Sequence, residues 1–280
     1  MLILLLSLPR MASTFIYHVA SLRLGKCGRE WLHLIEPFNG EVMYSIHYFG
    51  FVKHDKLGLV HHDYDLLRRE YPDIYELAIK NSEWYWKWSQ SEEGIVEVPF
   101  LGHDWHRLLK ALHDLDLKIL VKDVALWARS DEVVRQLPNV KIIFLIRDRK
   151  VFVQEIASWV REHGRYRIRH YLKWGLEHPR QVLKLATRLG KVMRYVKLRS
   201  MLRRSWSIHG LAHAVTHLEQ GKTQYTTIEE LAEKLYDHYL EKVTKCLEEA
   251  RENIHVVHVP RGWVGEDYVV ENVVRLIQRI

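Results

Sequence analysis

The feature that most constrains the fold is a set of short, strongly apolar segments separated by much longer amphipathic stretches. These segments are Leu2–Leu8, Lys118–Val121, Val140–Ile146 and Ile254–Val259. Near-continuous runs of Leu, Ile and Val, without polar alternation, are typical of strands that are buried on both faces of a parallel sheet. Because parallel strands need long crossover connections, the pattern predicts an α/β fold with a central parallel sheet flanked by helices.

The segments between the expected strands carry helical signals. Ile228, Glu229 and Glu230 follow Thr227 in a capping-box pattern, which is typical of the start of a helix. Near the end of the chain, five Val and Ile residues at helical spacing form one apolar stripe. We expect helices at Ser13–Leu22, Tyr64–Ser89, Asp104–Asp114, Asp131–Gln136, Thr227–Arg251 and from Gly265 onward.

The apolar N-terminal run does not have the pattern of a targeting or membrane segment. It has no basic region before it and no small-residue cleavage site after it, and it is far shorter than the ~20 residues that cross a bilayer. The two cysteines, Cys27 and Cys246, form neither a disulfide framework nor a metal-knuckle spacing. We therefore expect a cytoplasmic protein without a membrane span.

The positive charge of the chain is concentrated in one segment. Residues 161–204 hold fourteen Lys or Arg and two Glu, a net charge of +12, whereas the rest of the chain carries −5. We expect one domain over residues 1–280, with residues 161–225 as a basic helical insertion. The basic residues have three interpretations: a solvated helical hairpin, an electrostatic funnel for an acidic acceptor or a polyanionic donor, and a surface that binds nucleic acid.

Residues Pro9–Thr14 connect the first expected strand to the following helix. In parallel α/β folds, ligands gather at the carboxyl ends of strands, and a helix N-terminus presents unpaired N–H groups and a positive dipole end. Arg10 adds a full positive charge, and Ser13 and Thr14 add hydroxyl donors. This composition predicts an anion-binding loop, although the Walker pattern is absent. Alternatively, Ser13 and Thr14 only cap the helix and Arg10 is solvated.

Four segments, in order, resemble motifs of the sulfotransferases that use 3′-phosphoadenosine 5′-phosphosulfate. Leu8–Phe15 looks like their phosphosulfate loop, and Glu36–Asn39 like the E-P-F segment that follows the first helix. Val121–Val124 is similar to the K-D-P stretch of the bacterial and protein-tyrosine branches. Lys141–Lys150 is similar to the block that binds the 3′-phosphate. The resemblance implies a three-layer P-loop-like fold, the phosphosulfate nucleotide as co-substrate, and no metal.

The resemblance also implies roles for individual residues. Arg10 and the loop amides would hold the 5′-phosphosulfate, Lys122 would neutralise charge on the bridging oxygen, and Glu36 would be the general base. The implied catalytic residues are thus Glu36, Lys122 and Arg10. The implied co-substrate contacts are Arg10, Met11, Ala12, Ser13, Thr14, Arg147 and Ser158.

The same residues have structural alternatives. Glu36 can be a surface carboxylate before a turn, Lys122 can pair with Asp123, and Arg147 can pair with Asp148 at the surface. These structural alternatives predict a surface position for Glu36 and pairs between sequence neighbours for Lys122 and Arg147, whereas the functional interpretation predicts that all three lie together at a ligand site.

The chain departs from the family pattern at several positions. Ala12 stands where the family has glycine, which disfavours a positive φ and a close approach of the backbone to a ligand. Met11 replaces a serine, and Arg149 replaces a proline. Glu155 stands where the family has the serine that contacts the 3′-phosphate, and Ser158, one helical turn further, is the substitute.

Other candidate sites have simpler explanations. His61–Asp63 and His103–His106 can chelate a metal, but we interpret them as surface or capping residues and predict no metal. The aromatic cluster Trp84–Trp88 is interpreted as packing, with an acceptor wall as the alternative.

The sequence as a whole predicts a sulfotransferase that acts by in-line displacement on a hydroxyl or amine acceptor. The alternatives are a kinase-like transferase of the same fold and a non-catalytic binder of polyanions or nucleic acid through residues 161–204. The sequence predicts neither the acceptor, which the basic segment suggests is acidic, nor the oligomeric state.

Overall fold

The computed structural model of the chain divides into two compact units. The first comprises Met1–Tyr85, Phe100–Phe152 and Tyr236–Ile280, and the second comprises Trp86–Pro99 and Val153–Leu235. The residues that the structure describes are 1–8, 11–25, 31–39, 42–43, 46–47, 52–54, 57–80, 104–158, 228–261 and 266–280. The predicted basic insertion at 161–225 therefore lies outside the described residues.

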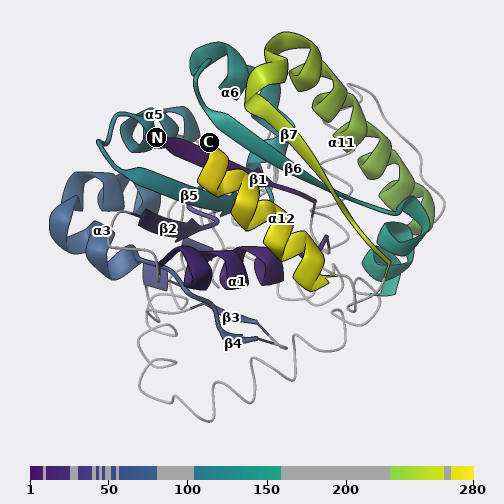
Figure 1. Cartoon of the computed structure of the whole chain (residues 1–280), viewed down its shortest axis with the longest axis horizontal. Helices are drawn as coiled ribbons and strands as arrows, with labels where there is room; N and C mark the ends of the chain where they lie inside the picture. Colours follow the sequence, from purple (N-terminus) through teal and green to yellow (C-terminus); the bar gives the residue numbers. More distant parts are fainter. Residues whose placement is uncertain are drawn as a thin grey trace, which may run out of the picture. The chain divides into compact units, whose positions relative to one another are not determined.

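The first unit is built on a five-stranded sheet in which every strand is parallel to its neighbours (Figure 1). The order across the sheet is β2-β5-β1-β6-β7. Strand β1 is central, and all five of its residues are buried, as its uninterrupted Leu/Ile sequence predicts. The strands are β1 (Leu2–Leu6), β2 (Trp31–Ile35), β5 (Lys118–Asp123), β6 (Lys141–Arg147) and β7 (Ile254–Val259).

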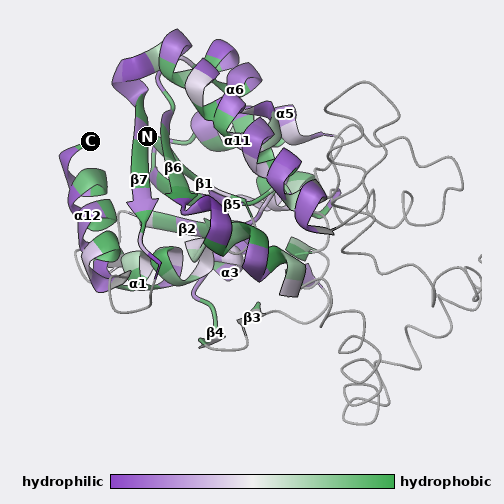
Figure 2. Cartoon of the chain, turned by 90° about the vertical axis from the view of Figure 1, so that its right-hand side faces the viewer, coloured by the Kyte–Doolittle hydropathy of each residue, from purple (hydrophilic) through white to green (hydrophobic). Residues whose placement is uncertain are grey.

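Helices cover both faces of this sheet (Figure 2). The connection from β1 to β2 and the connection from β5 to β6 run in opposite directions across the sheet. Because such crossovers are right-handed, α1 and α6 cover opposite faces. The C-terminal helix α12 packs against α1 on its face, and α5 and α11 lie on the same side as α6. The bounds are α1 (Ser13–Gly25), α5 (Trp105–His113), α6 (Ser130–Gln136), α11 (Ile228–Ala250) and α12 (Glu266–Arg279).

Both helical layers contact the sheet through apolar side chains. The predicted stripe of α12 is confirmed, since Val269, Val270, Val273, Val274 and Ile277 are all buried. On the opposite face, the Tyr239 ring of α11 packs edge-on against Phe144 of β6. The Tyr239 hydroxyl donates to the carbonyl oxygen of Leu145 at 2.8 Å, so this buried polar group has a partner.

All four predicted strands are confirmed, and β7 has the predicted bounds. The expected helix at Tyr64–Ser89 is interrupted in its described part, because helix α3 covers only Tyr64–Glu70 and a second helical segment covers residues 72–80. Tyr71 takes φ −136° and ψ 60°, which is reasonable because the residue before a proline is disfavoured in the helical region. Residues 81–89 lie outside the described residues.

Four further short elements belong to the first unit. The short 3-10 helices η1 (Leu126–Arg129) and η2 (Arg251–Asn253) precede α6 and β7. Strands β3 (Lys53–His54) and β4 (Gly58–Leu59) form a separate antiparallel pair. Among the described residues, no helix is both long and apolar enough to cross a bilayer.

Candidate functional site

The candidate site lies at the carboxyl edge of the parallel sheet. From β1 the chain leaves toward α1 on one face, whereas from the adjacent β5 it leaves toward η1 and α6 on the opposite face. Such a change of direction between neighbouring strands is where open α/β sheets bind ligands. Most of the residues predicted from the sequence lie at this edge: Glu36 after β2, Lys122 near the end of β5, Met11–Thr14 after β1, and Arg147 at the end of β6.

Glu36 and Lys122, which are 86 positions apart in the sequence, form a buried ion pair. Lys122 is 1 % exposed and Glu36 is 8 % exposed, so Glu36 is not the surface carboxylate of the structural alternative. The Lys122 ammonium donates to Glu36 Oε1, and Asn39 Nδ2 donates to Glu36 Oε2 at 2.7 Å. Two buried charges and a buried amide thus satisfy one another.

The backbone of Glu36 is held in an unusual conformation. Its N–H donates to the carbonyl oxygen of Lys122 at 2.6 Å, and its own carbonyl oxygen accepts from the Asn39 N–H at 3.0 Å. Glu36 has φ +50°, in the left-handed region that costs an L-residue about 1–2 kcal/mol. The tight turn at residues 36–39 folds the chain back directly after β2, and it fixes the carboxylate beside Lys122.

Asp123, the neighbour of Lys122, has a different role from the pairing partner considered above. It is fully buried, and its Oδ1 accepts hydrogen bonds from the Ala125 N–H at 2.7 Å and the Leu126 N–H at 2.8 Å. Its Oδ2 accepts from the Phe38 N–H at 3.3 Å. Burial, followed by the negative charge of Glu36, raises the pKa of Asp123 to about 7. Asp123 therefore ties the end of β5 to both of the loops that flank it.

The described part of the predicted phosphosulfate loop is compact. Met11 and Ser13 are buried, Thr14 is half-buried, and the Ile16 N–H donates to the Ala12 carbonyl oxygen at 3.0 Å as the first turn of α1 forms. Ala12 takes φ +58°. The expectation that alanine would keep this position out of the left-handed region is therefore wrong. The turn adopts the backbone that glycine would favour and carries the strain of a Cβ atom.

Arg147 ends β6 with its side chain buried, 5 % exposed. The surface pairing of Arg147 with Asp148 is not the arrangement found. Asp148 accepts from Arg261 Nη2 at 2.8 Å and from the Val151 N–H at 3.1 Å, and these bonds, led by that with Arg261, lower the pKa of its carboxyl. The Arg147 carbonyl oxygen accepts a 2.6 Å hydrogen bond from the Tyr236 hydroxyl of α11. This bond fixes the strand end that carries the guanidinium.

Several predicted residues remain outside this description. Pro9 and Arg10 lie outside the described residues, as do residues 159–227 with the whole basic segment. Glu155 is half-buried and Ser158 is exposed at the end of the helical residues 149–158, which extend into the second unit. The assignment of Arg10 and Ser158 as co-substrate contacts stays a prediction.

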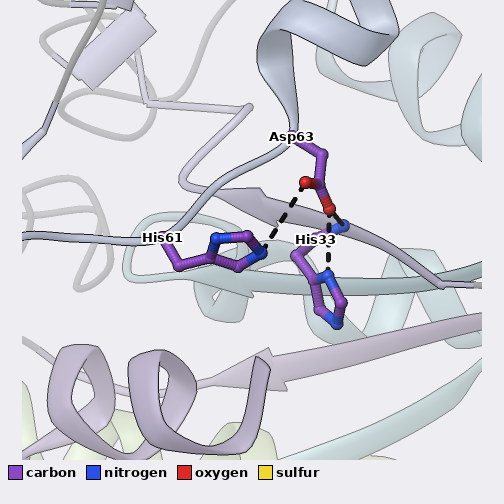
Figure 3. Close-up of side chains that lie close together, drawn as sticks. All are labelled: His33, His61 and Asp63. Atoms are coloured by element: carbon purple, nitrogen blue, oxygen red, sulfur yellow. Dashed lines mark hydrogen bonds and ion pairs between the residues drawn. The ribbon is translucent and has the colours of Figure 1, made fainter. Parts of the chain in front are cut away.

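A second group of chemically active side chains was only partly visible in the sequence. His33, on strand β2, lies beside His61 and Asp63, which precede helix α3 (Tyr64–Glu70) (Figure 3). Asp63 Oδ2 lies 2.9 Å from His33 Nδ1 and accepts a 2.8 Å hydrogen bond from the His33 N–H, while Asp63 Oδ1 lies 3.6 Å from His61 Nε2. Sequence reasoning considered His61–Asp63 alone, because nothing in the pattern reveals that β2 places His33 there.

The electrostatics of this group follow from its partial burial. Burial lowers the pKa of His61, and neighbouring His33 and His18 act in the same direction, opposed by Asp63. Burial alone would raise the pKa of the Asp63 carboxyl. The hydrogen bonds from His33 and the nearby His33 and His61 side chains outweigh burial, so this pKa is lowered. At neutral pH, the group therefore combines an ionised carboxylate with a neutral His61 imidazole.

Comparisons with models of known protein families and with curated proteins found no match to this chain.

Proposed function

We propose that the chain is a sulfotransferase that uses 3′-phosphoadenosine 5′-phosphosulfate, with a diverged donor site. The observation that carries the proposal is the buried contact between Glu36 and Lys122 at the carboxyl edge. The resemblance assigns these two residues to the same reaction step, although they come from motifs 86 positions apart. A buried charge pair next to a strained turn is also more typical of a functional site than of a core.

In the proposed fold, β1 leads into a phosphosulfate loop of P-loop-like type. The central position of β1 and the start of α1 directly after Ala12 support this assignment. The N–H groups of the first helical turn offer hydrogen bonds to an anion, and the Ser13 and Thr14 hydroxyls add two donors.

The proposed chemistry is an in-line displacement at sulfur. The acceptor oxygen forms a bond to sulfur while the bond between sulfur and the bridging oxygen breaks. Glu36 takes the proton of the acceptor, and the Lys122 ammonium stabilises the negative charge that develops on the bridging oxygen. In the resting structure these two charges neutralise each other, and the developing oxyanion would replace Glu36 as the partner of Lys122.

The donor assignment is tested by calorimetry with the desulfated product, 3′-phosphoadenosine 5′-phosphate. Two single variants are tested. Arg147→Lys keeps the charge but loses the bidentate geometry, and Arg10→Ala removes the charge. Each should weaken binding of the product about tenfold or more. Arg251→Ala is the matched control, because Arg251 is exposed next to the amino end of β7, at the opposite edge. The donor assignment is wrong if the wild-type protein does not bind, or if both site variants bind as tightly as the control.

Two results would direct the assignment elsewhere. Thermal stabilisation by ATP, without stabilisation by the sulfate-donor product, would indicate a kinase-like transferase. Salt-dependent binding to DNA or heparin that is insensitive to Arg10→Ala would indicate a polyanion-binding protein.

The general base is tested by transfer of labelled sulfate from the donor to a panel of phenols, alcohols and amines. Glu36→Gln should retain affinity for the donor product and lose about 10²–10⁴-fold in turnover. Glu132→Gln, on helix α6, is the control carboxylate and should keep the wild-type rate. Unchanged turnover in Glu36→Gln would remove Glu36 as the base.

A further inference from the structure

The group of His33, His61 and Asp63 has the geometry of a metal site. One ligand atom from each residue lies within 4.8 Å of the other two. Figure 3 shows His61 Nε2 and His33 Nδ1 both facing the Asp63 carboxylate from different directions. Bonds of about 2.0–2.2 Å to a tetrahedral ion would place ligand atoms about 3.3–3.5 Å apart. The distances between ligand atoms, 2.9 Å and 3.6 Å, lie on either side of that value.

The surroundings of the group also hold buried polar atoms. Three buried side-chain atoms in this neighbourhood have no hydrogen-bond partner within the described part of the chain: Tyr17 Oη, His33 Nε2 and His62 Nδ1. Tyr17 lies close enough to Asp63 that the carboxylate helps burial to raise the pKa of the phenol. Because His33 would bind an ion through Nδ1, its Nε2 and the other two atoms are left for ordered water.

The ligand set selects the chemistry of the ion. Two imidazole nitrogens and one carboxylate suit zinc and similar transition metals, whereas magnesium and calcium prefer oxygen ligands alone. His33 is buried, but His61 and Asp63 keep 33 % and 22 % of their side-chain surface exposed. An ion held by these three residues would thus keep a coordination position for water, as in sites with three protein ligands.

The local structure suits such an ion. The Asp63 N–H donates to the His33 carbonyl oxygen at 2.9 Å, so residues 61–63 already lie along the outer edge of β2. We propose that His33, His61 and Asp63 bind one divalent transition-metal ion of the zinc class. The ion takes the place of the proton between His33 Nδ1 and Asp63 and links β2 to the start of α3. This site is separate from the proposed sulfuryl-transfer residues, and its test uses no nucleotide.

The test uses untagged protein treated with a chelator and then titrated with Zn²⁺ in competition with a chelating dye. The wild-type chain should bind one tight equivalent, and the Co²⁺ form should show the absorption of a four-coordinate ion. His61→Ala removes a partly exposed ligand and should weaken binding by about 100-fold or more, since even changes around metal ligands cost about 10–100-fold. Asp63→Asn should weaken it in the same direction.

His113→Ala is the matched control. His113 Nδ1 lies 3.3 Å from Asp114 Oδ1, a histidine–carboxylate contact without a third ligand among the described residues, and the variant should bind like the wild type. As an independent readout, Zn²⁺ at 100 times Kd should raise the wild-type Tm by about 5 °C and leave that of His61→Ala unchanged. The proposal is overturned if the wild type binds no stoichiometric Zn²⁺, or if His61→Ala and Asp63→Asn bind it as tightly as His113→Ala.

Discussion

The buried pair of Glu36 and Lys122 makes a quantitative prediction about stability. Replacing Lys122 with Met leaves the Glu36 carboxylate buried without its counter-charge, which should lower the free energy of unfolding by about 3–5 kcal/mol. Glu36→Gln keeps an acceptor for Lys122 but removes the negative charge, and should cost about 2–3 kcal/mol. The double variant removes both charges and should lose no more than about 3 kcal/mol. The coupling energy is then about 3 kcal/mol.

The assay is urea unfolding at pH 7, followed by far-UV circular dichroism, for the wild type and the three variants. The control cycle uses Arg129→Met and Glu132→Gln, because this pair has a 2.6 Å contact but side chains that are 25 % and 32 % exposed. Its coupling energy should stay below about 1 kcal/mol. If the cycle on Glu36 and Lys122 gives a coupling no larger than the control, the two charges are not mutually dependent, and the argument for one joint site is refuted.

Three further predictions concern individual residues and are checked by the same unfolding assay. Ala12→Gly should stabilise the chain by about 0.5–1 kcal/mol because it removes the strain of φ +58°. The control Ala20→Gly, inside α1, should destabilise it by about 1 kcal/mol, and equal effects of the two changes would show that Ala12 is not strained. The pKa of Asp123, about 7, lies above the ordinary aspartate pKa of 3.8. The native state therefore binds more protons between those values, and the free energy of unfolding should fall as pH rises through them. Relative to that of Asp123→Asn, the free energy of unfolding of the wild type should fall by about 4 kcal/mol. A wild-type advantage that grows with pH would contradict this prediction. Burial alone would raise the pKa of Asp131, but hydrogen bonds from Lys242 and Lys245 lower it to about 2. The extra free energy of unfolding of the wild type over Asp131→Asn should therefore be present above pH 4 and shrink as pH falls toward 2. A difference that does not change with pH would contradict this.

The sheet was predictable from the sequence wherever a strand is apolar throughout. Central strand β1 satisfies this rule, because a strand covered by helices on both faces has no polar positions to display. Edge strand β7 carries His255 and His258 and was predicted from its Ile and Val residues. Strand β2 was missed because its sequence, WLHLI, has a histidine at its centre and only one β-branched residue, whereas β7 has four. His33 is 2 % exposed only because Asp63, 30 positions later, accepts hydrogen bonds from its backbone and its ring. Such a tertiary partner leaves no local signal.

The candidate site was predictable in its location but not in its contacts. The position of Lys122 and Arg147 at strand ends follows from the apolar runs that precede them. The pairing of Lys122 with Glu36, however, depends on β2 lying next to β5, with Ile35 opposite Lys122 in the register. Since β2 itself was not recognised, neither this pairing nor the burial of Glu36 could be deduced. The conformation of Ala12 was predicted wrongly because a local rule about alanine was applied where the surrounding structure imposes the turn.

The distribution of costly features argues that the carboxyl edge has been shaped by function rather than by folding alone. Within the described residues, the two non-glycine residues with positive φ are Ala12 and Glu36, and both lie at this edge. In the same described part of the chain, the formally charged residues that are buried belong there as well, apart from Asp131, whose carboxylate is paired with two lysines of α11. Left-handed alanine and a buried ion pair each cost free energy that a glycine or an apolar side chain would avoid. A chain selected only for stability would not gather these costs at one edge, and this supports the proposal that the carboxyl edge is a functional site.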